Sequence, residues 1–572
     1  MKTARVFTFF IVALISAANT FSQQTAQKID ALVKQYHDYG QFNGSVLVAE
    51  KGKIIYEKGF GLANMEWAVP NQPDTKFRIG SLTKQFTAAL VLQLAEEGKI
   101  KLDGKITDYL TDYRKDTGDK VTIHQLLNHT SGIPSYTNRP GFFAEFSRDP
   151  YNITDFVKKF ASGDLEYEPG SKYSYNNSGY SLLGAIIEKV TGKSYETVLT
   201  ERIFKPLGMT NSGYDNHAPL IQKRASGYEK RPSGYVNAPY LDMSLPYAAG
   251  SIYSTVDDLF KWDQALYQDK IVSAENKKLM FTPGLGNYGY GIRITDQPIG
   301  KTGQKTKVIQ HGGGISGFNS LLTRLVDKQQ TIILLDNVSL GGYHGNITNS
   351  ITSILNGQPV EPPKRSIAET LYKIAVEKDT ASAIAEYRKL KAQNSPAYDF
   401  SEGELNILGY QLLGMNRTKD AIEIFKLNVE MFPDSSNPYD SLGETYLADG
   451  QKDLALANYK KAAELDPKNS NAIQIVRQLE DKEVKVDSSG FDAYVGEYQV
   501  TPGLILTISR EGDKLFGQLT GQGKLAVEPV SDAQFTIPEV KANITFEKDA
   551  AGKVTGLLLS QGTRTANAPK IK

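Results

Sequence analysis

Residues 74–88 read DTKFRIGSLTKQFTA and contain the pattern Ser-x-x-Lys at Ser81 and Lys84. The apolar run that follows predicts a helix that stops near Gly98, so Ser81 should lie where this helix begins. Side chains three residues apart on a helix share one face, which brings the hydroxyl and the amine into contact. A serine hydroxyl becomes a good nucleophile when a base takes its proton, and a lysine with a lowered pKa can be that base. The pattern makes Ser81 a candidate nucleophile, although Ser-x-x-Lys is also frequent by chance.

Four more stretches follow downstream. They are LLNHTSGIPSY (126–136), EPGSKYSYNNSGYSLLG (168–184), AAGSIYSTVDDLFKW (248–262) and HGGGISGF (311–318). Together with residues 74–88 they resemble, in the same order, segments of the superfamily of serine β-lactamases, D-aminopeptidases and esterases. The resemblance implies a serine hydrolase with an α/β domain of the β-lactamase/transpeptidase type, in which helices flank an antiparallel sheet.

The resemblance assigns the chemistry to particular residues. Ser81 would be the nucleophile, and Lys84 and Tyr175 would transfer protons, with the division between them left open. Tyr175 and Asn177 fall on the Tyr-x-Asn motif of the family, and Asn177 would hydrogen-bond Lys84 and the substrate amide. The backbone N–H groups of Ser81 and Gly314 would form the oxyanion hole.

His311 falls on the third motif of the family in its His-x-Gly form, and with Gly313 it would contact the substrate. Penicillin-binding enzymes have the lysine of Lys-Thr-Gly there, and that lysine helps to bind a substrate carboxylate. The histidine therefore favours an esterase or a peptidase acting on D-amino-acid or small-peptide substrates. A β-lactamase or penicillin-binding DD-peptidase is the first alternative, and a non-catalytic scaffold or sensor of cell-wall fragments is the second. The literal Lys-Thr-Gly at 301–303 lies in a polar stretch that predicts a hairpin connection.

The composition removes several classes of chemistry. The chain has no cysteine, which excludes thiol nucleophiles, disulfides and Cys-ligated metal centres. Its six histidines lack the spacing of zinc motifs, and we expect neither a metal nor a cofactor. The formal charge of +1 gives no reason to expect nucleic-acid binding.

The N-terminal residues have the order of a secretory signal. Lys2 and Arg5 precede an apolar run over residues 6–18, and small and polar residues follow through Ser22. We therefore predict a signal peptide over residues 1–22 and an exported protein, periplasmic or secreted. The run is shorter than the roughly 20 residues that span a bilayer, so no membrane span should remain after cleavage.

Alternating apolar residues predict a sheet built from both ends of the first domain. Residues 44–64 indicate a β-hairpin, and residues 288–337 indicate several antiparallel strands. Strands from these two regions would join one sheet. The proline-rich stretch GQPVEPPKR (357–365) predicts a domain boundary, so we assign residues 23–360 to the hydrolase domain.

Beyond this boundary, a period of 34 residues, as between Gly409 and Gly443, resembles a tetratricopeptide array. We predict all-α helical repeats over residues 366–484. Such a stack offers a concave surface to a peptide or protein partner, or it serves as a spacer or oligomerisation arm. Short alternating runs predict that residues 488–572 form a small antiparallel, barrel-like β-domain, which would shape the active-site entrance or build a homo-oligomer.

Overall fold

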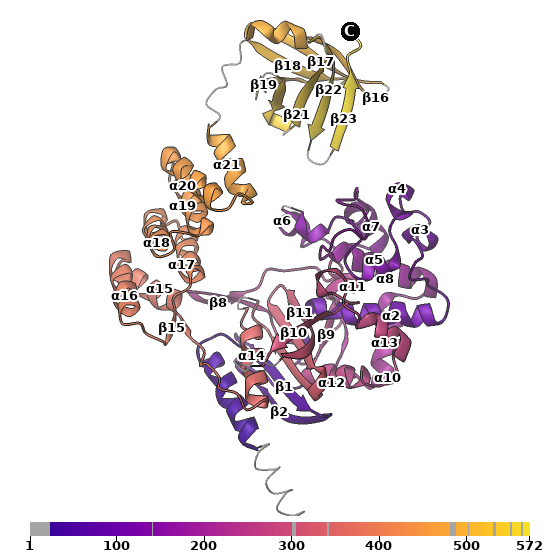
Figure 1. Cartoon of the computed structure of the whole chain (residues 1–572), viewed down its shortest axis with the longest axis vertical. Helices are drawn as coiled ribbons and strands as arrows, with labels where there is room; N and C mark the ends of the chain where they lie inside the picture. Colours follow the sequence, from indigo (N-terminus) through magenta and orange to yellow (C-terminus); the bar gives the residue numbers. More distant parts are fainter. Residues whose placement is uncertain are drawn as a thin grey trace, which may run out of the picture. The chain divides into compact units, whose positions relative to one another are not determined.

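The structure is a computed structural model and is shown in Figure 1. It describes residues 23–139, 141–299, 305–339, 342–480, 488–501, 503–529, 533–540, 542–549, 552–561 and 564–572. The predicted signal peptide and the Lys-Thr-Gly sequence at 301–303 lie outside the described residues. The chain divides into two compact units, Met1–Glu404 and Leu405–Lys572. The domain limits that the sequence indicates stay predictions.

The first unit is built on a six-stranded antiparallel sheet. In spatial order its strands are β10 (Arg293–Pro298), β11 (Lys305–Ile315), β12 (Phe318–Leu325), β13 (Gln330–Asp336), β1 (Gly44–Glu50) and β2 (Lys53–Gly59). The whole of β1 pairs with β13, from Gly44 opposite Asp336 to Glu50 opposite Gln330. The prediction that strands from the two ends of the domain join one sheet is confirmed.

Side chains of the central strands are buried on both faces of the sheet. Leu47 and Ala49 of β1 belong to the large core that includes α2 (Thr83–Glu96). Val46 and Val48 belong to the core formed with the helix over residues 23–38 and with α14 (His344–Leu355). Because successive side chains of a strand point to opposite faces, helices cover the sheet on both sides. The predicted class of this unit, an antiparallel sheet flanked by helices, is confirmed.

The helices of the first unit lie mainly between β5 and β10 in the sequence (Figure 1). After α2 they are α3 (Ile106–Tyr109), α4 (Lys115–Gly118), α5 (Ile123–Leu127), α6 (Phe142–Phe146), α7 (Ile153–Phe160), α8 (Asn177–Thr191), α9 (Tyr195–Leu199), α10 (Lys205–Leu207), α11 (Tyr247–Gly250), α12 (Val256–Ala265) and α13 (Ala274–Met280), followed after the sheet by α14, α15 (Ile367–Glu377) and α16 (Thr380–Ala392). None of the helices among the described residues is both long enough and apolar enough to cross a membrane.

Helix α2 is the central helix of this unit, and its side chains from Thr83 to Leu92 are all buried. A helix that is buried on every side is enclosed by its neighbours, and its polar side chains must find partners among them. Just before it, β5 (Phe77–Arg78) pairs with β9 (Ile252–Ser254), so the stretch around Ser81 lies beside the stretch that contains α11. This pairing brings together two of the family-like segments.

The second unit begins within α17 and continues with regular helices. The helices are α17 (Glu402–Gly414), α18 (Thr418–Met431), α19 (Ser436–Ala448), α20 (Lys452–Leu465) and α21 (Ser470–Glu480). A Cβ atom at Gly409 would lie 2.5 Å from the ring of Phe425, and one at Gly443 would lie 3.0 Å from the ring of Tyr459. The same glycine-to-ring contact thus recurs after one sequence period. The helical middle region is confirmed, whereas its assignment to the tetratricopeptide class stays a prediction.

The last part of the chain is an eight-stranded antiparallel sheet that nearly closes into a barrel. Its strands, in spatial and chain order, are β16 (Gly496–Thr501), β17 (Leu504–Glu511), β18 (Lys514–Leu519), β19 (Lys524–Pro529), β20 (Gln534–Ile537), β21 (Ala542–Lys548), β22 (Val554–Gln561) and β23 (Arg564–Pro569). Glu497 at the start of β16 exchanges backbone hydrogen bonds with Ile571 and Lys572, just beyond β23. The first and last strands therefore meet, as the predicted barrel-like domain requires.

Candidate active site

Ser81 lies in a tight turn in front of the central helix. The turn is a 3-10 helix, η1 (Gly80–Leu82), whereas the sequence had placed Ser81 at the start of α2 itself. Gly80 has a φ of +51°, and a Cβ atom there would lie 3.1 Å from the backbone of Gly314. Glycine fits this left-handed, crowded position. The turn presents Ser81 to a large cavity.

Lys84 is fully buried one turn further on. Its Nζ atom lies 3.1 Å from Ser81 Oγ, 2.8 Å from Asn177 Oδ1 and 2.9 Å from the carbonyl oxygen of Ala249. Burial removes the hydration that stabilises an ammonium ion, and it lowers the pKa of Lys84 well below its ordinary value. The structure thus brings together the hydroxyl, the amine and the amide that the sequence singled out.

Aromatic rings enclose the amine. Lys84 Nζ lies 4.9 Å from the ring centre of Tyr175 and 5.5 Å from that of Tyr180. The Tyr175 hydroxyl is buried and forms no hydrogen bond of normal geometry among the described residues. Burial raises the pKa of Tyr175, and the nearby Ser81 hydroxyl opposes this rise in part. Tyr175 is therefore a neutral phenol at pH 7, next to both Ser81 and Lys84.

Asn177 is held in place by two hydroxyl groups. It is the first residue of α8, and its side-chain amide donates to Thr137 Oγ1 at 3.1 Å. Its backbone N–H donates to Ser135 Oγ, also at 3.1 Å. These contacts orient Oδ1 toward Lys84. Sequence reasoning missed both hydroxyl residues, although Ser135 lies inside the family-like stretch at 126–136.

His311 lies in β11 and is buried, with 7% of its surface exposed. Its Nδ1 atom lies 2.6 Å from the carbonyl oxygen of Gly312, and its Nε2 atom lies 2.8 Å from the Tyr288 hydroxyl. Burial lowers the pKa of His311 to about 3, so the ring is neutral at pH 7. Because a carbonyl oxygen only accepts hydrogen bonds, Nδ1 carries the ring proton and Nε2 accepts from Tyr288. Sequence reasoning missed Tyr288, which belongs to none of the family-like stretches.

The glycines after His311 allow β11 to touch the turn that carries the serine. A Cβ atom at Gly313 would lie 2.0 Å from the carbonyl oxygen of Ile79 and 2.4 Å from Ser320 Oγ. No side chain fits in this space. The close approach sets the backbone of Gly314 next to Gly80 and the serine turn, and both Ser81 and Gly314 line the same cavity.

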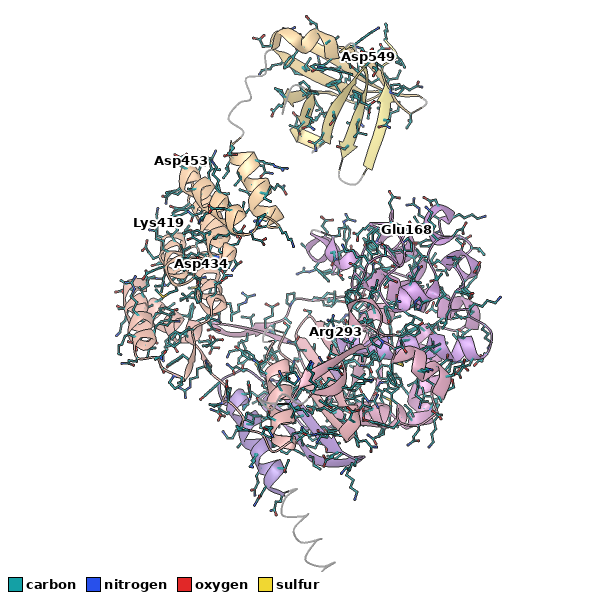
Figure 2. The ribbon with its side chains drawn as sticks, in the orientation of Figure 1. Glu168, Arg293, Lys419, Asp434, Asp453 and Asp549 are labelled. Atoms are coloured by element: carbon teal, nitrogen blue, oxygen red, sulfur yellow. The ribbon has the colours of Figure 1, made fainter. Side chains whose placement is uncertain are left out.

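The cavity in front of Ser81 has a volume of 720 Å³. Its lining includes Ser81, Thr137, Asn177 and Gly314, the apolar side chains of Phe143, Leu241 and Ile315, the ring of Tyr240, and the charged side chains of Arg148 and Glu229. Tyr175 and His311 line a neighbouring cavity of 270 Å³ together with Arg293, which Figure 2 labels. Gly313 lines a third cavity between the sheet and α14.

His129 packs inside the aromatic group rather than facing a cavity. Its ring centre lies 4.4 Å from that of Tyr175 and 4.6 Å from that of Tyr288, and Nδ1 accepts a hydrogen bond from the Asn176 N–H at 3.1 Å. These contacts agree with a structural role. In the part of the chain that the structure describes, no group of three or more His, Asp or Glu side chains could hold a metal ion.

A serine whose proton can pass to a buried amine, beside backbone N–H groups, can attack a carbonyl carbon and hold the oxyanion that forms. On this fold, the chemistry is that of a serine hydrolase. The sequence profile described as Beta-lactamase matches residues 29–344, more than half of the chain, so the chain belongs to the Beta-lactamase family. A profile described as a domain of unknown function (DUF3471) matches residues 480–568.

Three relatives illustrate the likeness. Penicillin-binding protein 4* of Bacillus subtilis (strain 168) is 33% identical over 365 residues, which cover 60% of this chain and 79% of that protein. The crystal structure of D-amino acid amidase from Ochrobactrum anthropi SV3, complexed with D-phenylalanine, is 26% identical, has a TM-score of 0.50 and covers 59% of this chain and 99% of that chain. The octameric penicillin-binding protein homologue from Pyrococcus abyssi shares the fold at 20% identity and a TM-score of 0.50, over 95% of this chain and 99% of that chain.

We predict that Gly313→Ala lowers the rate of ester hydrolysis roughly 100-fold, because the new Cβ would displace the Ile79 carbonyl and the turn behind it. Gly312→Ala is the matched control, since the nearest neighbour of its Cβ lies 3.6 Å away. Turnover of a nitrophenyl ester and thermal unfolding are measured for both variants. Equal activity of the two variants would show that the contact between β11 and the turn does not matter.

Proposed function

We propose that this protein is an exported hydrolase that cleaves neutral ester or amide substrates through an acyl-enzyme on Ser81. The observation that carries the proposal is the set of three contacts made by Lys84 Nζ, with Ser81 Oγ, Asn177 Oδ1 and the Ala249 carbonyl oxygen. Each partner restricts which hydrogen bonds the amine can form.

A neutral lysine amine has two N–H groups and one lone pair. Asn177 Oδ1 and the carbonyl oxygen of Ala249 can only accept hydrogen bonds, so they occupy both N–H groups. The lone pair is left for the third neighbour, Ser81, whose hydroxyl proton it can accept across 3.1 Å. This arrangement supports Lys84 as the general base of acylation.

The reaction then runs as acyl transfer in two steps. Lys84 takes the Ser81 proton while Oγ bonds to the substrate carbonyl carbon, and the electron pair of the carbonyl moves to its oxygen. The N–H groups of Ser81 and Gly314 hold that oxyanion. When the intermediate collapses, the bond to the leaving group breaks and the leaving group takes a proton from Tyr175 or Lys84. Water that loses its proton to the same pair releases the acid and restores Ser81.

The neutral state of His311 bears on the substrate. Its ring nitrogens are engaged by Gly312 and Tyr288, so it offers no positive charge to a carboxylate. A penicillin or a peptide that ends in a free carboxylate would lack the electrostatic partner that a lysine supplies at this position. Neutral esters and amides do not need that partner, which favours them as substrates.

The cavity in front of Ser81 suits a substrate with an apolar side chain. Phe143 and Tyr240 line this cavity, and 49% and 48% of their surfaces are exposed. An apolar group bound against these rings would remove them from water, at about 25 cal/mol for each Å² buried. The likeness to a D-amino acid amidase supports D-amino-acid amides and esters as the substrate class.

A penicillin-binding DD-peptidase or a β-lactamase is the second candidate. Arg148 lines the same cavity and offers a cation to a substrate carboxylate. The relative from Bacillus subtilis carries the name of a penicillin-binding protein, which supports the same candidate.

Export and assembly complete the proposal. A signal peptide over residues 1–22 would direct the protein to the periplasm or to the medium. The octameric homologue supports a homo-oligomer. A peptide or protein partner at the helical repeats rests on the sequence period alone.

We expect a fluorophosphonate probe to label the wild-type protein and not Ser81→Ala, because only an activated hydroxyl attacks the probe. Ser147→Ala, which changes a serine of the same cavity, is the control and should be labelled like the wild type. Labelling is read by mass spectrometry of the intact protein. A label that survives in Ser81→Ala would remove Ser81 from its proposed role.

The substrate class is tested with three substrates at pH 7.5. We expect kcat/KM to be highest for a short-chain nitrophenyl ester, lower for a D-phenylalanine amide and lowest for a chromogenic cephalosporin, because His311 supplies no charge for the cephalosporin carboxylate. Arg148→Gln should leave the first two values nearly unchanged. If the cephalosporin is the best substrate and Arg148→Gln abolishes its turnover, the second candidate is correct.

Acid should slow the labelling of Ser81, because the base must lose its proton before it can act. Burial lowers the pKa of Lys84, so its neutral form persists to lower pH than that of an ordinary lysine, whose pKa is about 10.4. The labelling rate should rise with pH and level off well below that value. In Lys84→Arg the group stays protonated, and labelling should be roughly 100-fold slower at every pH. A midpoint at the ordinary lysine pKa would refute Lys84 as the base.

A further inference from the structure

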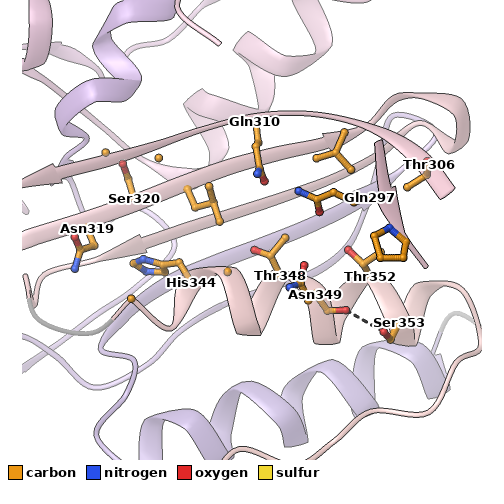
Figure 3. A pocket seen from close by; sticks show the side chains of 17 residues that line it. Gln297, Thr306, Gln310, Asn319, Ser320, His344, Thr348, Asn349, Thr352 and Ser353 are labelled. Carbon is orange, nitrogen blue, oxygen red and sulfur yellow. Dashed lines mark hydrogen bonds between the residues drawn. The ribbon is translucent and has the colours of Figure 1, made fainter. Parts of the chain in front are cut away.

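A second large cavity lies on the other side of the sheet from Ser81. It has a volume of 720 Å³ and lies between α14 and the strands β10, β11 and β12 (Figure 3). Its lining shares no residue with the cavity in front of Ser81. The volume falls within the roughly 300–1,000 Å³ of ordinary small-molecule sites. The cavity shares Gln310, Gly312 and Leu321 with the smaller cavity of Tyr175 and His311.

The lining is uncharged, and its polar side chains lie among apolar surface such as that of Val308 and Leu321. Eight residues with neutral side chains that can form hydrogen bonds line the cavity: Gln297, Thr306, Gln310, Asn319, Thr348, Asn349, Thr352 and Ser353. Ser320 also borders it, but its hydroxyl points to the other face of the sheet. Among the described residues, no Lys, Arg, Asp or Glu lines it. The titratable side chain is His344, and burial lowers its pKa to about 4, so it is neutral at pH 7. Amides and hydroxyls both donate and accept hydrogen bonds.

Two of the hydroxyls are buried without a partner. Thr306 and Thr348 are each 3% exposed, and their Oγ1 atoms form no hydrogen bond among the described residues. Buried polar atoms in native proteins nearly always form a hydrogen bond. Two buried hydroxyls without one, at the same cavity, therefore indicate that a ligand supplies the hydrogen bonds. In Figure 3, Thr348 projects from α14 toward the strands, and Gln310 projects from β11 toward α14. The two elements thus present polar groups to the same space.

We propose that this cavity binds a neutral saccharide of one or two rings. Each ring hydroxyl can donate and accept a hydrogen bond, which matches a lining of amides and hydroxyls. An anionic ligand would find no cationic side chain among the described lining residues, and an apolar ligand would leave the hydroxyls of Thr306 and Thr348 unpaired. The lining therefore selects an uncharged, hydroxyl-rich ligand.

The site lies directly behind the strands that reach the serine turn. Ser320 lines the cavity and stands opposite Gly313 in the β11–β12 pair. Its hydroxyl donates to the carbonyl oxygen of Ile79 at 2.8 Å, two residues before Ser81. The Ser320 side chain points to the Ser81 side of the sheet, because Ser320 pairs with Leu335, which belongs to the core around α2. A bound saccharide would therefore lie against the opposite face of the strand that supports the serine turn.

The test uses the full chain and titration calorimetry with glucose, maltose, N-acetylglucosamine and its β-1,4-linked dimer. Glucuronate and glucosamine are the charged counterparts. We expect at least one neutral sugar to bind, and its charged counterparts to bind more weakly. Absence of binding by all four neutral sugars overturns the proposal, and so does tighter binding of glucuronate or glucosamine.

Variants locate the binding. Thr348→Val removes the unpaired hydroxyl at constant shape, and Asn349→Ala removes an amide of the lining; each should weaken sugar binding roughly 2- to 12-fold. Asn346→Ala changes an exposed asparagine of the same helix outside the lining and should bind like the wild type. Labelling of Ser81 by the fluorophosphonate probe shows that each variant is folded. Unchanged affinity in both lining variants, or an equal loss in Asn346→Ala, places the sugar elsewhere and overturns the proposal.

Discussion

The amine of Lys84 lies where three separate stretches of the first unit meet, and its burial constrains all of them. An ammonium ion taken out of water must either find acceptors inside the protein or lose its proton. Asn177 supplies one acceptor from the start of α8, and the Ala249 carbonyl supplies another from α11. A shift of either element relative to α2 would leave a buried polar group unpaired. The geometry of the site therefore depends on the packing of these helices, and the packing depends on the buried amine.

Strand β11 lies so close to the turn in front of α2 that no side chain fits at Gly313. Gly313 lies against the carbonyl of Ile79, and Gly314 lies against Gly80. Two residues earlier, His311 is fixed as a neutral ring by Gly312 and Tyr288. The same strand thus sets the position of the serine turn and leaves the neighbouring polar group without charge. The glycines of β11 set the position of the serine turn, and the buried His311 leaves the site without a positive charge at that point.

Local patterns in the sequence predicted the elements well. The spacing of Ser81 and Lys84 and the alternation along β1 and β13 depend on residues close in the chain, and such patterns survive folding. The partners of Asn177 could not be found this way, because Thr137 is brought to it by tertiary packing 40 residues away. The neutral state of His311 was equally hidden, since it depends on burial and on Tyr288, which lies outside every motif. The 3-10 turn at Ser81 lies against β11, and no local pattern records this contact between distant segments.

The pairing of β1 with β13 has a consequence for the synthesis of the chain. Gly44 bonds beside Asp336, which the ribosome adds about 290 residues later. At 5–20 residues per second, roughly 15–60 s separate the two strands, and for that time β1 has only β2 beside it and one edge unpaired. An unpaired strand edge invites pairing with other chains. The free edge of β1 must therefore be kept from pairing with other chains until β13 is made. The sheet cannot assemble before most of the first unit has been translated.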